Sequence, residues 1–196
     1  VDERSRAIQK AGNNTFLLQN KDIYLDMLTD SGVNAMSDRQ TAAMHLADDS
    51  YAGSETFARL KTAMKEVFGT DNVLPAHQGR ACENILAERF VKPGMVAIMN
   101  FHFTTTKAHV TRCGGEVVEV LHKKGLVPQS DDPFKGDMDL QELRRVITEY
   151  GPEKVAYVRV EAGTNLIGGQ PVSLENMLAV ADVCHEFGVP SVLDAS

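Results

Sequence analysis

The amino-acid sequence predicts an α/β protein in which a mostly parallel sheet lies between two layers of helices, a three-layer αβα fold. Short apolar runs of strand length alternate with helical stretches of roughly 10–15 residues, which is the pattern of βαβ units. At 196 residues and 43% hydrophobic, the chain can bury one good core. The last apolar run ends at Asp194, and ligands bind at such strand ends in open α/β sheets. We therefore expect a ligand site at the carboxyl edge of the sheet.

The beginning of the chain is predicted to be an arm followed by two capped helices. Residues 1–36 have weak periodicity and many polar side chains, which is typical of an arm rather than a packed element. Ser37 can cap a helix that runs to about Leu46, and Ser54 can cap another that runs through Phe68.

Strands and helices are then expected to alternate up to the last residue. The strands are expected at 73–76, 96–99, 115–120, 155–160 and 189–194, the last of them buried. The helices are expected at 80–91, 139–150 and 173–187, with a loop at 123–137. We accordingly divide the chain into an N-terminal segment, 1–36, and the N-terminal part of a larger domain, 37–196.

The composition excludes several classes of protein. The formal net charge is -7, and the charged residues form no long block of one sign, which argues against a nucleic-acid binder. No run of about 18 apolar residues occurs, so we expect no membrane span. Cys82, Cys113 and Cys184 are widely spaced and lack a Cys-x-x-Cys pair, a usage typical of reduced thiols in a cytoplasmic protein.

The segment His77-Gln78-Gly79-Arg80 stands between an expected strand and an expected helix. Gly79 would let the backbone approach a ligand, and the N–H groups of the helix start would point toward an anion. Gln78 and Arg80 would add side-chain donors. A phosphate site is one interpretation of this segment, and a tight turn without a ligand is the other.

Three further features follow the ends of strands. Phe103 and its neighbouring threonines could stack on a flat ring and bind its substituents, or they could simply belong to the core and to a helix cap. Asn165 is the best hydrogen-bond donor in a glycine-rich loop that could also be a plain connector. Asp194 is an acid at a strand end, and its alternative role is a helix N-cap.

An anion-binding helix start, an aromatic ring, an amide and an acid are together what pyridoxal phosphate needs from a protein. The helix start would hold the phosphate, and the aromatic ring would stack on the pyridine ring. The amide would contact the phenolic oxygen. The acid would keep the ring nitrogen protonated, which allows the ring to accept electrons from a carbanion.

The sequence resembles the β-eliminating lyases, a family of the aspartate aminotransferase-like superfamily that includes tyrosine phenol-lyases and tryptophanases. The shared motifs lie at 28–38, Tyr-Ala-Gly-Ser at 51–54, His-Gln-Gly-Arg at 77–80, Phe-Thr-Thr-Thr at 103–106, Phe-Lys-Gly-Asp at 134–137 and Gly-Gly-Gln-Pro-Val-Ser at 168–173. The resemblance covers the whole chain but only the N-terminal half of the family enzyme. It implies an incomplete large domain of pyridoxal phosphate fold type I.

The resemblance implies cofactor contacts at matching positions. Gln78, Gly79 and Arg80 would hold the phosphate of pyridoxal phosphate. Phe103 would stack on the ring, Asn165 would contact the phenolic oxygen, and Asp194 would pair with the ring nitrogen.

The resemblance also implies substrate and cation contacts. Thr29 and Ser31 would seat the substrate carboxylate, and Phe16 would line the closing cleft. Gly32 would offer its carbonyl to a monovalent cation such as potassium. Asp49 falls at an acidic residue of the same cation site, where the family has the longer Glu.

The reaction implied is α,β-elimination of a tyrosine-like amino acid to pyruvate, ammonia and phenol. Tyr51 would be the general acid that protonates the leaving group, reaching into a neighbouring subunit, and Thr104 would touch the leaving phenol. Tryptophanase-like chains carry Asp where Thr104 stands, which favours the phenol-lyase branch. Residues 160–164 depart from the phenol-lyase pattern, and Ala76 replaces the family's Thr. A tryptophanase or a cysteine-type β-lyase is therefore the alternative, and a non-catalytic fragment of this fold is another.

The resemblance also implies partners. The family's Schiff-base lysine lies well after the aspartate strand, and no lysine of this sequence matches it. We therefore expect the remaining half of the enzyme, on the same or a separate chain, to be needed for activity. A homo-oligomer, built as a dimer of dimers, is expected as well.

Overall fold

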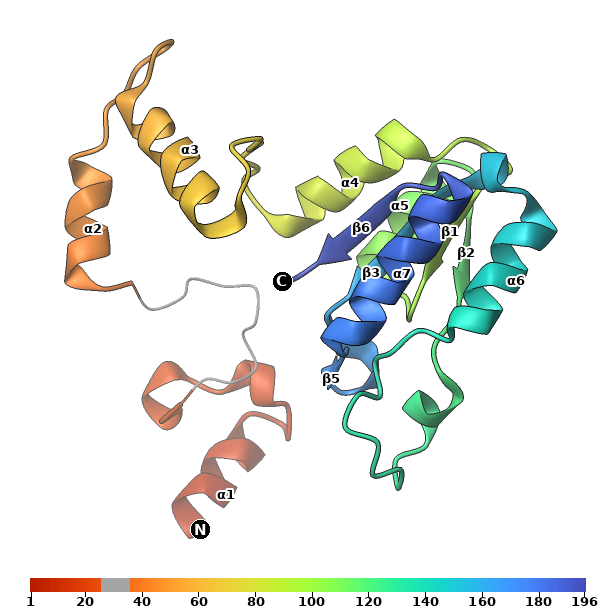
Figure 1. Cartoon of the computed structure of the whole chain (residues 1–196). Coiled ribbons are helices and arrows are strands. Elements are labelled where there is room, and N and C mark those ends of the chain that lie inside the picture. The colour runs from red at the N-terminus through yellow and green to blue at the C-terminus, as the bar shows by residue number, and fades with distance from the viewer. Residues whose placement is uncertain (26–35) are drawn as a thin grey trace. The chain divides into compact units, whose positions relative to one another are not determined.

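The computed structural model describes residues 1–25 and 36–196 of the chain. It divides into two compact units, Val1–Val73 and Leu74–Ser196. Figure 1 shows the helical first unit in red to yellow, and the sheet and its helices in green to blue. This boundary differs from the division at residue 36 expected from the sequence, which stays a prediction about domains.

The first unit consists of short helices. They are α1 (Asp2–Lys10), the 3₁₀ helices η1 (Thr15–Leu17) and η2 (Asn20–Asp22), α2 (Asp38–His45) and α3 (Glu55–Phe68). Both predicted helices are confirmed with their caps. The Ser37 hydroxyl accepts from the Gln40 amide in a full capping box, and the Ser54 hydroxyl accepts from the Phe57 amide. Gly69, with φ 74°, ends α3 in the left-handed conformation that glycine tolerates best.

Helix α1 lies where the sequence predicts only an arm. Its apolar residues are too few to give a clear helical period, but its charges suit the helix dipole. Asp2 and Glu3 lie in the first turn and Lys10 in the last, where each sign of charge is favourable. The structure differs here from the arm expected from the sequence, because this helix is favoured by the placement of its charges rather than by apolar periodicity.

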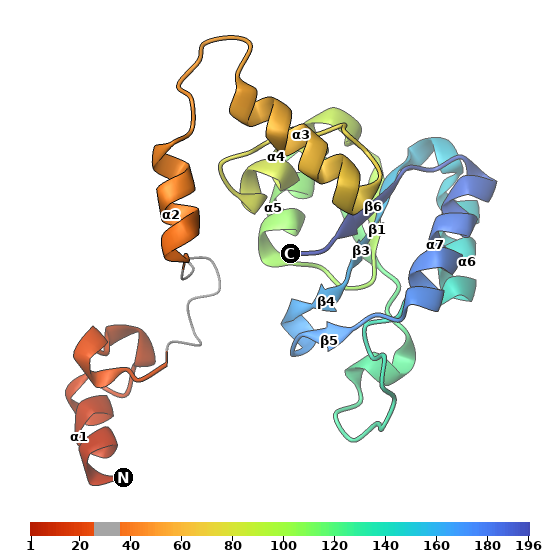
Figure 2. The ribbon, with the colours of Figure 1, turned by 60° about the vertical axis from the view of Figure 1, so that its left-hand side comes forward.

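The second unit contains a four-stranded parallel sheet with the order β2-β1-β3-β6. Its strands are β1 (Val96–Met99), β2 (Glu116–Glu119), β3 (Val155–Glu161) and β6 (Ser191–Asp194). A separate antiparallel pair joins β4 (Gly163–Thr164) to β5 (Gln170–Pro171). Figure 2 shows this small pair beside the C-terminal ends of the central strands.

Helices cover both faces of the sheet, as a three-layer fold requires. On one face, α6 (Leu140–Tyr150) and α7 (Leu174–Phe187) pack on β1 and β3 through residues such as Leu143, Val180 and Ile98. On the other face, α4 (Gly79–Phe90) and α5 (Thr104–Arg112) contribute Ala87 and Val110 to a second apolar cluster. The predicted α/β class with its mostly parallel sheet is confirmed.

Two strand predictions are wrong in detail. Residues 73–76 form no strand in the described part of the chain, since this short run contains Pro75, which lacks the N–H that a sheet ladder needs. The strand at the C-terminal end is present as β6, but it is not buried. Within the described residues it pairs only with β3, at the edge of the sheet, and Leu193 is 58% exposed. The loop predicted at 123–137 also contains a short 3₁₀ helix, η3 (Lys123–Leu126).

Within residues 1–25 and 36–196 the structure contains no helix with the length and hydrophobicity that a membrane crossing requires.

Gly136 allows the loop before α6 to pack closely against the β4–β5 pair. Its N–H donates to the Pro171 carbonyl at 2.9 Å. A Cβ at this position would lie 2.7 Å from the Gln170 carbonyl oxygen and 2.6 Å from the Thr164 hydroxyl. Backbone carbonyls cannot move away cheaply, so this glycine is required by packing.

We expect Gly136→Ala to lower the free energy of unfolding of the complete protein by about 1–3 kcal/mol, the usual cost of overpacking. Urea denaturation followed by circular dichroism measures this change. Gly163→Ala is the matched control, because a Cβ there has no neighbour within 4 Å. Equal stability of the two variants would contradict the packing role of Gly136.

Candidate functional site

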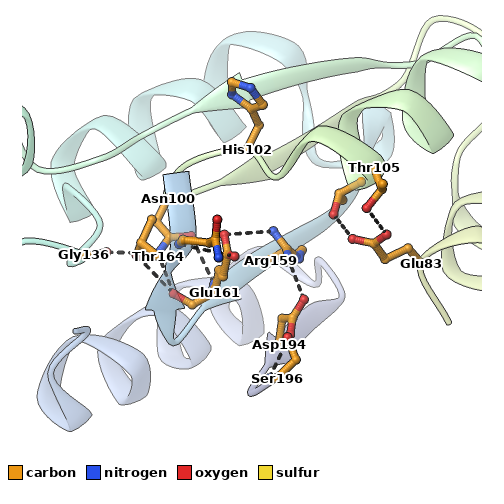
Figure 3. Close-up of polar contacts among 12 residues, drawn as sticks. Glu83, Asn100, His102, Thr105, Gly136, Arg159, Glu161, Thr164, Asp194 and Ser196 are labelled. Atoms are coloured by element: carbon orange, nitrogen blue, oxygen red, sulfur yellow. Dashed lines mark hydrogen bonds and ion pairs between the residues drawn. The ribbon is translucent and has the colours of Figure 1, made fainter. Parts of the chain in front are cut away.

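The carboxyl ends of three parallel strands meet at one edge of the sheet. Strand β1 ends at Met99, β3 at Glu161 and β6 at Asp194. The register pairs Glu161 directly with Asp194. Figure 3 shows the polar side chains that gather at this edge. The sequence prediction of a site at the strand ends therefore has a structural counterpart in which several polar side chains converge.

Asn100, the residue after β1, ties this edge together. Its side chain is fully buried, and its amide nitrogen lies 3.0 Å from the carbonyl oxygens of Gly136 and Glu161 and from the Thr164 hydroxyl. Its amide oxygen accepts the Glu161 N–H at 3.1 Å. One side chain thus joins the ends of β1 and β3, the loop before α6 and the start of β4.

Asn165 follows directly from this cluster. It is the first residue of the 3₁₀ helix η5 (Asn165–Ile167), and its side chain is exposed. The preceding Thr164 is completely buried, and its hydroxyl donates to the Glu161 carbonyl at 3.2 Å. The buried neighbour therefore fixes the backbone from which the exposed amide projects.

Asp194 is half-buried at the end of β6. Its Oδ2 accepts from Arg159 Nη2 at 2.6 Å, and its Oδ1 accepts from the Ser196 hydroxyl at 2.7 Å and the Ser196 amide at 3.1 Å. Burial opposes ionisation of this carboxyl. The hydrogen bonds from Ser196 and Arg159 outweigh it and hold the pKa of Asp194 below its usual value. The acid at the strand end is thus an ionised carboxylate at neutral pH.

Arg159 and Glu161 bring two further charges into the buried strand β3. Arg159 Nη1 lies 3.6 Å from Glu161 Oε2, and their side chains are only 4% and 9% exposed. Burial raises the pKa of Glu161, and the charge of Arg159 opposes this rise. Sequence reasoning missed both residues, although two charges within an otherwise apolar strand were a signal that could have been used.

The start of α4 is open to a ligand. Gln78 is the N-cap residue, and it makes no capping hydrogen bond with its side chain. Gln78, Gly79 and Arg80 are all exposed, and a Cβ on Gly79 would have no neighbour within 4 Å. The first N–H groups of the helix are therefore accessible to an anion, which is the geometry that binds phosphate at helix starts.

Glu83 joins α4 to the first turn of α5. Its carboxylate accepts from the Thr105 hydroxyl at 2.5 Å and also from the Thr106 hydroxyl. Phe103, the half-buried N-cap residue of α5, and the exposed Thr104 directly precede these two threonines. Glu83 therefore fixes the candidate aromatic relative to the helix of the candidate phosphate site. This link cannot be predicted from local sequence patterns, since the partners are more than 20 residues apart.

His102 lies at the same edge, beside the end of β2. Its Nδ1 contacts Glu119 Oε1, and its backbone N–H donates to the same oxygen at 3.3 Å. Figure 3 shows its ring apart from the Asp194 group.

The other predicted site residues lie outside this unit. Phe16, Asp49 and Tyr51 belong to Val1–Val73, and all three are exposed. Thr29, Ser31 and Gly32 lie outside the residues that the structure describes. Among residues 1–25 and 36–196 no group of three or more His, Cys, Asp or Glu side chains is arranged to hold a metal ion. The predicted cofactor contacts and Thr104 thus all belong to one unit, Leu74–Ser196.

Comparison with solved structures defines the class of fold. Bna3p from Saccharomyces cerevisiae matches 98% of this chain and 47% of its own with a TM-score of 0.63 at 17% identity. Cystalysin from Treponema denticola, solved with a pyridoxal 5'-phosphate cofactor, matches 78% of this chain and 38% of its own with a TM-score of 0.57 at 15% identity. The fold is that of the fold type I pyridoxal phosphate enzymes, and the chain forms part of such a domain.

Sequence comparison is more specific. A model of the family described as Beta-eliminating lyase matches residues 26–196. The chain therefore belongs to the β-eliminating lyase family, as its motifs predict. It is 44% identical to a tyrosine phenol-lyase of Fusobacterium nucleatum over 98% of this chain, and 44% identical to one of Nostoc punctiforme over 99%. The chain spans about 42% of the length of these curated relatives.

We expect Asn100→Ala to lower the free energy of unfolding by about 3 kcal/mol, because several buried backbone groups lose their partner. Chemical denaturation of the complete protein measures this loss. Affinity for pyridoxal phosphate should fall too, since Asn165 directly follows Thr164, whose hydroxyl Asn100 bonds.

Asn176→Ala is the matched control for this variant. Asn176 is also buried, and its side chain bonds the backbone N–H and carbonyl of Met138 at 2.9 Å. It should cost comparable stability but leave affinity for the cofactor unchanged. If both variants weakened cofactor binding equally, the role of Asn100 at the sheet edge would be refuted.

Proposed function

We propose that this protein is part of a pyridoxal phosphate-dependent carbon–carbon lyase that converts a tyrosine-like amino acid to pyruvate, ammonia and phenol. The observation that carries the proposal is an ionised carboxylate, Asp194, at the carboxyl edge of the sheet in a chain that resembles tyrosine phenol-lyases along its whole length. An ionised acid is what a protonated pyridine nitrogen requires as its partner.

The residues at the sheet edge fit pyridoxal phosphate. The uncapped start of α4 offers free N–H groups to the phosphate, with Gln78, Gly79 and Arg80 beside it. Phe103 would stack on the ring, and the exposed Asn165 amide would donate to the phenolic oxygen. When bound, the cofactor would supply an electron sink for the carbanion formed at the substrate Cα.

The protein's own residues would then handle the substrate and the leaving group. Thr29 and Ser31 would bind the substrate carboxylate, and Phe16 would help to exclude water from the closed cleft. Tyr51 would donate its phenolic proton to the leaving group as the Cβ–Cγ bond breaks. The Thr104 hydroxyl would hold the oxygen of the leaving phenol.

The proposal extends to a cation and to partners. Gly32 and Asp49 would contribute oxygen ligands to a potassium ion, which hard oxygen donors suit. The remaining half of the enzyme, on the same or a separate chain, would supply the Schiff-base lysine. A homo-oligomer built as a dimer of dimers would bring Tyr51 into a neighbouring subunit's site. We also propose that residues 1–36 form an N-terminal segment separate from the large domain, and that the protein is cytoplasmic.

A lyase for another β-substituted amino acid is the second candidate. The observation that favours it is the departure of residues 160–164 from the phenol-lyase pattern, directly before Asn165. Thr104 favours the phenol-lyase, since a tryptophanase-like chain carries Asp at that position. A non-catalytic fragment of this fold is the third reading.

The products distinguish these candidates. The complete protein, incubated with pyridoxal phosphate, should show the visible absorbance of the bound cofactor and release phenol and pyruvate from tyrosine. Release of indole from tryptophan, or of sulfide from cysteine, in place of phenol would instead support the second candidate. A preparation that binds no cofactor would refute the enzyme assignment altogether.

We expect Tyr51→Phe to reduce the rate of phenol release about 10²–10⁴-fold, the usual contribution of a general acid. Cofactor affinity should stay at the wild-type value, because the lost hydroxyl acts on the leaving group alone. Stopped-flow or steady-state pyruvate assays with tyrosine measure the rate.

Tyr24→Phe is the matched control, since Tyr24 is an exposed tyrosine of the same unit with no assigned role. Its rate should equal that of the wild type. Undiminished phenol release by the Tyr51 variant would remove Tyr51 from the mechanism.

A further inference from the structure

Strand β3 carries two opposite charges in a position where charges are costly. Every residue of this strand is buried, and the exposure of the whole residue, backbone included, is 3% for Arg159 and 7% for Glu161. Charged side chains are almost never so buried unless they are paired, and even a paired burial carries a desolvation penalty. Apolar residues would stabilise the strand at a lower desolvation cost. The two charges therefore indicate a functional role at the carboxyl edge of the sheet, where Asp194 lies.

The geometry shows where the arginine is held. Arg159 Nη2 donates to Asp194 Oδ2 at 2.6 Å, whereas Nη1 lies 3.6 Å from Glu161 Oε2, too far for a hydrogen bond. Among the described residues, Arg159 Nη1 and Glu161 Oε2 have no hydrogen-bond partner. Arg159 is therefore bonded to Asp194 and attracted by Glu161, and Figure 3 shows it between the two carboxylates.

We propose that Arg159 and Glu161 are positioning residues for Asp194: Arg159 shares the Asp194 carboxylate with the ring nitrogen of pyridoxal phosphate, and Glu161 limits how strongly Arg159 holds it. This inference rests on the proposed function, because it assumes that Asp194 faces the cofactor ring. It concerns two residues that do not themselves touch the cofactor.

The physical reason is competition for one carboxylate. A carboxylate that already binds a guanidinium attracts a second cation less strongly, so the ring nitrogen would lose its proton more easily. The negative charge of Glu161 counteracts Arg159 and supports a protonated ring. In a buried site this effect is large, because charges are poorly screened there. Arg159 and Glu161 on β3 would thus set the degree of protonation of the ring nitrogen. That protonation determines how well the ring accepts electrons.

Other charged side chains act on the Glu161 carboxyl group as well. Burial raises the pKa of Glu161, Arg159 lowers it, and the carboxylates of Asp194 on β6 and Glu83 on α4 raise it further. Glu83 is bonded to the hydroxyls of Thr105 and Thr106 and so remains in place in variants of β3.

Ring protonation can be measured without catalysis. The complete protein is loaded with pyridoxal phosphate labelled with ¹⁵N in the ring, and the nitrogen chemical shift is followed against pH. We expect Glu161→Gln to lower the pH at which the ring loses its proton by about one unit, because one nearby negative charge is removed. Adding Arg159→Met to this variant should return the midpoint to the wild-type value or above it.

This reversal separates positioning from mere structural support. If the two residues only stabilised the strand, the double variant would be at least as impaired as the single one. Glu142→Gln is the matched control, since Glu142 forms an exposed ion pair with Arg145 on α6, and it should leave the midpoint unchanged.

The outcomes also distinguish this inference from the proposed function. Absence of bound cofactor in the wild-type protein would overturn both. A bound cofactor whose ring midpoint is unchanged by Glu161→Gln, or is not restored by Arg159→Met, would overturn the inference alone.

Discussion

The buried amide of Asn100 is the interaction on which the sheet edge depends. It stands at the end of the central strand β1 and bonds the backbone or side chains of Gly136, Glu161 and Thr164, which are 36 to 64 residues away in sequence. A buried amide that loses such partners costs more than the bonds contribute when made. The positions of the end of β3, the β4–β5 pair and the loop before α6 therefore depend on one another. Asn165 directly follows Thr164 in this group of segments, so its position depends on them too.

Electrostatics provide the second constraint at this edge. Arg159 lies between two carboxylates, one on its own strand and one on β6, so that the three side chains carry one net negative charge when all are ionised. The carboxylate at the strand end, Asp194, has the lowered pKa, and the more deeply buried Glu161 has the raised one. The carboxyl with the lowered pKa is therefore the more accessible of the two, and it lies where a cationic ring would meet it.

Most helices and strands could be predicted from local sequence signals, whereas the contacts between residues far apart in the sequence could not. Ser37, Ser54 and Ser173 cap helices because a hydroxyl reaches an amide only three residues ahead, and such spacing is readable from sequence. Asn100, Glu83 and Arg159 could not be assigned in this way, since their partners are 22 to 64 residues away and depend on strand order. Residues 73–76 look apolar enough for a strand, but they join no sheet of the described chain, and Pro75 has no N–H to donate to a ladder.

The departure from the phenol-lyase pattern at 160–164 has a specific place in this structure. Asn100 bonds Glu161 and Thr164 in this segment, and both are buried, whereas Asn165 is exposed. A change at such positions alters how Asn165 and Asp194 are held. If the proposed function is correct, differences in this segment act on the electronic state of the cofactor ring. Thr104 and Tyr51, which would meet the leaving group directly, lie outside this segment, so the segment would act on substrate preference through the cofactor ring rather than through contact.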